Sequence, residues 1–130
     1  MKQEDGSAEH ASSPVLRLVQ RYVDAATKHG RAVNVGDSKT ANRQNARLTR
    51  ASRALRESGG EGRIALLRLM EHPDPWVRLS AAYDCLAFDE RRSIQVLEEI
   101  ARMPGFVGFT AETVLRERTK RANHGSSGLR

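Results

Sequence analysis

The helical organisation of this chain can be predicted outward from residues 72–86, which read HPDPWVRLSAAYDCL. Asp74 followed by Pro75 is typical of a helix start, because an aspartate side chain caps free backbone amides and proline suits the first helical turn. Small apolar side chains then recur at three- and four-residue steps. They are Val77, Ala81, Ala82, Cys85 and Leu86. The segment therefore predicts a helix over residues 75–87 with one narrow apolar face.

Amphipathic helices are also predicted on both sides of this segment. Ser13 and Pro14 form a helix start, and Lys28-His29-Gly30 has the basic residues and the glycine typical of a helix end. Apolar periodicity and capping residues indicate four more helices. We expect them from Asp37 or Ser38 to Ser58, from Glu61 to Glu71, after Asp89 as far as Pro104, and from Thr110 onward.

The fold class that follows is all-α, because no segment alternates polar and apolar residues as a half-buried strand does. About six helices joined by short connections are expected to pack against their neighbours in sequence. We therefore predict a short right-handed stack of antiparallel helix pairs, forming a single domain over residues 13–122. The polar segments 1–12 and 123–130 are predicted to be disordered tails.

One helix pair also carries a recognisable pattern between Ile64 and Ile100. Its residues are Leu66-Leu67, Asp74-Pro75, Val77-Arg78, Ala81-Ala82 and Leu86. This segment resembles a HEAT repeat, and most of residues 15–117 resembles a small bacterial HEAT-like family of unknown function. The resemblance implies an α/α superhelix and no activity, and it suggests the antitoxin or immunity role of some small helical-repeat proteins. A second unit, from Asp89 to Leu115, is degenerate because it lacks the Asp-Pro start.

The composition favours a soluble protein of a reducing compartment. Cys85 is the only cysteine, so an internal disulfide is excluded, and its apolar neighbours indicate a small core residue. Residues 1–12 lack the apolar stretch of a signal peptide, and no segment approaches the length of a membrane span. We therefore expect a cytoplasmic protein that does not enter a membrane.

No pattern of catalytic or metal-binding residues stands out. The four histidines, His10, His29, His72 and His124, are dispersed, and no metal-ligand, phosphate-loop or nucleophile motif occurs. We therefore expect no metal, no cofactor and no enzymatic activity. One alternative is a DNA glycosylase, since glycosylases built on HEAT-like repeats use a tryptophan and an aspartate, as Trp76 and Asp84 would provide. The resemblance is confined to repeat type, and no second aromatic is placed to enclose a damaged base.

The most unusual feature is a basic stripe in the second predicted helix. Its members are Lys39, Arg43, Arg47, Arg50 and Arg53, which share about 120° of arc at 100° per residue. No acidic residue occurs between Asp37 and Glu57, and residues 1–60 carry 11 of the basic and 6 of the acidic side chains. The stripe is interpreted as a solvated face, as a site for an acidic protein surface, or as a site for nucleic acid.

Trp76 is the second candidate binding residue. The corresponding position of a HEAT repeat usually faces outward, and an exposed tryptophan is an effective interface anchor. The alternative is that its ring folds over the neighbouring turn. Together with the basic stripe, Trp76 predicts a non-enzymatic module that binds a macromolecule, with an acidic protein surface as the expected partner and nucleic acid as the alternative. The sequence leaves the oligomeric state open.

Overall fold

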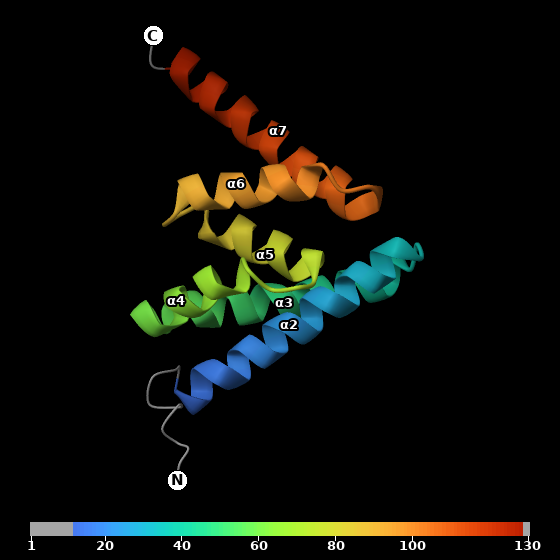
Figure 1. The fold of residues 1–130 in the computed structure, drawn as a ribbon, viewed down its shortest axis with the longest axis vertical. Coiled ribbons are helices and arrows are strands. Elements are labelled where there is room, and N and C mark those ends of the chain that lie inside the picture. Colours follow the sequence, from blue (N-terminus) through green and yellow to red (C-terminus); the bar gives the residue numbers. More distant parts are fainter. Residues whose placement is uncertain (1–11, 129–130) are drawn as a thin grey trace.

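The chain forms a stack of six helices in its computed structural model, which describes residues 12–128 (Figure 1). The helices are α2 (Ser13–Asn34), α3 (Ser38–Glu57), α4 (Gly59–Leu69), α5 (Pro75–Cys85), α6 (Glu90–Ala101) and α7 (Gly105–Gly128). No strand occurs among the described residues, so the all-α prediction is confirmed. Within this range no helix is long and apolar enough to cross a membrane.

Helices that follow one another in sequence pack against one another in space. Figure 1 shows α2, α3 and α4 in the lower part of the stack, α5 in the middle, and α6 and α7 above. The central helix α5 also contacts α2 and α7, so it touches every helix except α3 extensively. Because α5 joins the lower and upper parts of the stack, its position determines how the two ends of the domain are related.

Three helix starts lie where the capping residues predicted them. The side chains of Asp37, Asp74 and Asp89 accept hydrogen bonds from amides in the first turns of α3, α5 and α6. The Asp74 contact is the shortest, with Oδ1 2.8 Å from the amide nitrogen of Trp76. At α2 the cap is Ser12 and not Ser13, since the helix begins one residue earlier than predicted. Local capping chemistry therefore accounts for the starts of α2, α3, α5 and α6.

The prediction that the first helix ends at Gly30 is wrong, because α2 continues to Asn34. Gly30 is buried, and a methyl group in place of its hydrogen would overlap the indole ring of Trp76. The ring of His29 meets the same indole edge-on, with centroids 5.8 Å apart. The glycine is therefore not a helix end. It lets an aromatic ring lie directly on the backbone of α2.

The expectation that Trp76 faces outward is also wrong. Its side chain is only 8% exposed, because the indole fills the space beside Gly30. A large apolar ring stabilises the fold most when it is removed from water, and a neighbouring helix without a side chain provides the room. Trp76 therefore connects α5 to α2 and does not offer a free anchor to a partner.

The last helix differs from its predicted bounds at both ends. It begins at Gly105, whose φ of 82° turns the chain directly after α6, so Thr110 lies inside the helix. The Thr110 hydroxyl donates to the carbonyl of Phe106 instead of capping. The helix extends to Gly128, past residue 122, where we expected the domain to end. The predicted disorder of residues 1–11 and 129–130 lies outside the described residues.

The core lies where the inner faces of the helices meet. Its largest fully buried side chains include Tyr22, Leu55, Leu66, Met70, Leu97 and Ile100. Cys85 is also fully buried, as predicted, and burial raises the pKa of its thiol to about 12. A thiol that stays protonated and away from solvent is not a nucleophile, so the interpretation of Cys85 as a core residue is confirmed.

We expect Gly30→Ala to lower the free energy of unfolding by about 1–3 kcal/mol, because the added methyl forces the Trp76 indole out of its place. Gly60→Ala is the matched control, since nothing lies within 4 Å of a methyl there. The measurement is chemical denaturation of both variants. If Trp76→Phe makes room, the double variant Gly30→Ala/Trp76→Phe will lose less than the sum of its single losses. Strict additivity would contradict the proposed contact.

Candidate functional site

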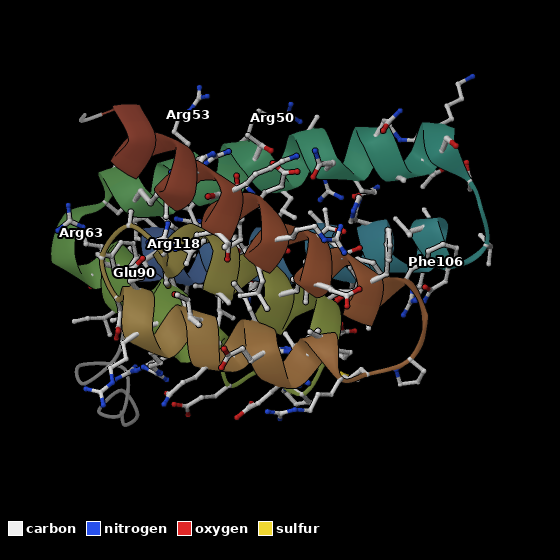
Figure 2. All side chains as sticks on the ribbon, turned by 90° about the horizontal axis from the view of Figure 1, so that it is seen from above. Arg50, Arg53, Arg63, Glu90, Phe106 and Arg118 are labelled. Atoms are coloured by element: carbon white, nitrogen blue, oxygen red, sulfur yellow. The ribbon has the colours of Figure 1, made fainter. Side chains whose placement is uncertain are left out.

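The predicted basic stripe forms the outer face of α3. Lys39, Arg43, Arg50 and Arg53 are all exposed. Figure 2 shows Arg50 and Arg53 projecting from α3 away from the body of the domain. Four of the five predicted side chains therefore share one solvent-facing surface.

Arg47, the fifth member, is placed differently because it turns toward α2. Its Nη1 atom lies 3.2 Å from Oδ2 of Asp24 and donates to Oε1 of Gln44 at 2.6 Å. Lys28 pairs with the same carboxylate at 3.1 Å. Hydrogen bonds from Lys28 and then Arg47 hold the pKa of Asp24 below its ordinary value. The charge of Arg47 is thus partly balanced by Asp24, which the sequence pattern of α3 could not reveal.

A shallow hollow of about 430 Å³ lies between α2 and α3 beside Arg47. We call it the arginine hollow. It is lined by Arg21, Arg47, Arg50, Leu18, Ala51 and Ala54. Arg21 was not among the predicted site residues, because it lies on the preceding helix and only the packing of α2 on α3 brings it to the stripe. Three arginine side chains therefore line the hollow together with the small apolar surface of Leu18, Ala51 and Ala54.

The hairpin formed by α2 and α3 is basic as a whole. Residues 12–58 contain ten lysine and arginine residues and three acidic residues, a formal excess of seven positive charges. The rest of the chain is nearly balanced, since residues 61–130 contain 11 basic and 10 acidic side chains. Such a one-sided distribution attracts anionic partners to the hairpin in preference to the other faces.

A cleft of about 580 Å³ lies on the other side of α3. α3, α5 and α7 line it, and Figure 2 looks down on this side, with α7 lying across α5 and α3 alongside. Trp76 and Asp84 both line it, together with His29 of α2. The two residue types that suggested a glycosylase are therefore brought together, although Trp76 is buried against Gly30.

A partly buried carboxyl group, that of Asp84, forms part of the cleft wall. The hydroxyl of Tyr22 donates to Oδ2 of Asp84 at 2.7 Å, joining α2 to α5. Burial raises the pKa of Asp84 above its ordinary value of 3.8, while Tyr22, Ser52 and Arg56 oppose that rise. Burial, followed by the charge of Asp84, raises the pKa of Tyr22 well above 10.0, so the phenol stays protonated and remains a donor.

Ser52 lies close enough to Asp84 to influence its pKa, yet its hydroxyl does not reach hydrogen-bond geometry. Ser52 is one of the residues that line the cleft, and its buried Oγ atom has no hydrogen-bond partner among the described residues. No group of three or more possible metal ligands occurs in the same range.

The sequence of residues 17–116 matches a family described as a domain of unknown function (DUF2019). Among solved structures, the fold is similar to that of the protein RPA1889 from Rhodopseudomonas palustris CGA009. The two are 25% identical with a TM-score of 0.74, and the match covers 82% of this chain and 88% of that one. No curated protein matches the sequence.

We expect Asp84 to make the stability of the domain fall as the pH rises. Its pKa is higher in the folded chain than its ordinary value of 3.8, so the folded state binds the proton more tightly than the unfolded state. Relative to Asp84→Asn, the wild type should therefore lose unfolding free energy as the pH rises from about 3.8 through the pKa of the folded state. Denaturation of both proteins across this range measures the difference. A wild type that gains unfolding free energy relative to Asp84→Asn as the pH rises would contradict the raised pKa of this carboxyl group.

Proposed function

The chain belongs to the family described as domain of unknown function DUF2019, and because that description names no activity, we propose from its own surface that it is a non-enzymatic module that binds an acidic protein. The α2–α3 hairpin is the binding face. Such a module would serve as an adaptor, or as an immunity-type protein that covers its partner.

The arginine hollow is the observation that carries this proposal. Arg21 and Arg50 line the hollow together with Arg47, whose charge is already shared with Asp24. A partner carboxylate can therefore form forked hydrogen bonds with the guanidinium groups of Arg21 and Arg50 without breaking the pair inside the protein. The apolar floor of Leu18, Ala51 and Ala54 gives room for the methylene groups that carry such a carboxylate.

The same surface favours protein over nucleic acid as the partner. Single-stranded nucleic acids bind to surfaces on which aromatic rings lie among the basic side chains. The stripe on α3 has no aromatic residue, since α3 itself contains none. The hollow is also a local site with an apolar floor, whereas a phosphate backbone is followed by a continuous basic track.

The proposal keeps the HEAT-like interpretation of α4 and α5. Support comes from the Asp74 cap and from Arg78, whose Nη1 atom donates to the carbonyls of His72 and Pro73. Its Nη2 atom also approaches the sulfur of Met103 at 3.8 Å, in the turn between α6 and α7. An arginine that joins successive helix turns is consistent with the polar ladder of such repeats.

The proposed setting is the cytoplasm. A single buried thiol, Cys85, is consistent with a reducing compartment, where cysteines are not used to crosslink a small domain.

Affinity purification tests the proposal. Tagged wild type is incubated with nuclease-treated lysate of its own cells, and captured proteins are identified and then purified for titration. We expect an acidic protein whose affinity falls at least tenfold for Arg21→Glu/Arg50→Glu, because two carboxylate contacts become repulsive. The matched control is Arg91→Glu/Arg102→Glu, which makes the same charge change. Arg91 lies in α6 and Arg102 directly follows it, and both are exposed.

Two results would contradict the proposal. Capture from a parallel untreated lysate that is lost from the nuclease-treated lysate would point to nucleic acid. Equal loss of affinity in the hollow variant and in the control would show that only net charge matters.

A further inference from the structure

The cleft between α3, α5 and α7 is separate from the basic face, and we propose that it binds a mononucleotide. The nucleobase, through its exocyclic amine, would lie against the cleft wall at Ser52 and Asp84, and the phosphate would lie beside Arg56. This site does not depend on the acidic protein partner, because it uses different side chains on the opposite side of α3.

The cleft wall includes a residue with an unsatisfied hydroxyl. Ser52 is only 4% exposed and is one of the residues that line the cleft, and its buried Oγ atom has no hydrogen-bond partner within the described part of the chain. Burying a hydroxyl without a partner costs free energy, so such groups are rare in native proteins unless a water or a ligand completes them. A ligand group that exchanges hydrogen bonds with Ser52 would remove that cost.

The neighbouring carboxylate of Asp84 can accept further hydrogen bonds. The Asp84 carboxylate accepts one hydrogen bond, from Tyr22 to Oδ2, in the part of the chain that the structure describes. Among the described residues, Arg56 acts on Asp84 only through its charge at a distance and forms no ion pair with it. A carboxylate in this position requires further N–H donors. The exocyclic amine of a nucleobase supplies two, one for Asp84 and one for Ser52.

The cleft also offers apolar and aromatic surface for the planar ring of a nucleobase. Leu48, Leu79 and Val114 give the cleft apolar surface from all three helices, and Tyr83 stands at its rim with 56% of its surface exposed. An exposed aromatic ring beside an apolar wall is suited to stacking on a planar base. The volume of about 580 Å³ lies within the range of small-molecule sites and admits one nucleotide.

Arg56 is placed to bind the phosphate of a nucleotide. Arg56 lines the cleft, and its Nε atom donates to the backbone carbonyl of Ser52 at 3.4 Å. The guanidinium is thereby held next to the orphaned hydroxyl, with its remaining donors available for phosphate. A simple cation would meet Asp84 favourably and Arg56 unfavourably, whereas a nucleotide satisfies both.

The test is a titration of the full chain with adenosine monophosphate, followed by NMR chemical-shift changes and calorimetry. We expect saturable binding with a dissociation constant of roughly 1 mM or tighter, and shifts on α3, α5 and α7. Ribose 5-phosphate, which lacks the base, should bind roughly tenfold more weakly. Asp84→Asn should weaken binding roughly tenfold, and Ser52→Ala roughly threefold to tenfold.

Ser52→Ala keeps the proposal testable if Asp84→Asn fails to fold. Removing an unpartnered buried hydroxyl leaves the melting temperature unchanged or slightly raised, so weaker binding by this variant cannot be ascribed to unfolding. The matched control is Arg43→Ala, on the outer face of α3, which should bind adenosine monophosphate as the wild type does.

Three outcomes would overturn the proposal. The first is no saturable binding up to about 10 mM, which leaves the cleft empty for this ligand class. The second is equal binding of ribose 5-phosphate, or shifts confined to the arginine hollow, which would indicate an anion site only. The third is displacement by a short single-stranded oligonucleotide at far lower concentration, which would assign the cleft to nucleic acid.

Discussion

The packing of the Trp76 indole on the bare backbone of Gly30 determines the geometry of the rest of the structure. It fixes α5 against α2 at the middle of the stack, and the Tyr22–Asp84 hydrogen bond joins the same two helices a few turns away. α5 in turn supports α6 and α7. The cleft depends on this contact, because α5 contributes its Trp76 and Asp84 side, whereas the arginine hollow is formed by the packing of α2 on α3.

The sequence predicted what is local and failed where the cause is tertiary. Asp37, Asp74 and Asp89 cap their helices because the interaction spans only two or three residues, and such signals survive in any context. Gly30 and Trp76 were misinterpreted for one shared reason. Gly30 after Lys28 and His29 resembles a helix end, and the position of Trp76 in the HEAT pattern usually faces outward, but in the folded chain the glycine provides the space that the indole fills.

The residues of the candidate sites show the same contrast between local and tertiary signals. Helical periodicity was enough to find the stripe on α3, since all its members lie on one helix. It could not find Arg21 or Asp24, which reach the stripe only through the packing of α2, nor could it separate Arg47 from its neighbours. The cleft was harder still. Ser52, Arg56 and Asp84 lie on two helices, and the signal that connects them is an unsatisfied hydroxyl, which has no counterpart in a sequence pattern.

The stacking of helices in chain order also bears on how the molecule is formed. When each helix packs mainly against the next one, most native contacts close short loops, and the entropy lost at each step is small. Folding can then proceed by addition of one helix at a time. The contacts of α2 with α5 are exceptions, since Gly30 meets Trp76 and the Tyr22–Asp84 hydrogen bond joins residues 62 positions apart. The wall of the cleft is therefore among the last parts of the domain to be completed, and among the first to open when the domain unfolds.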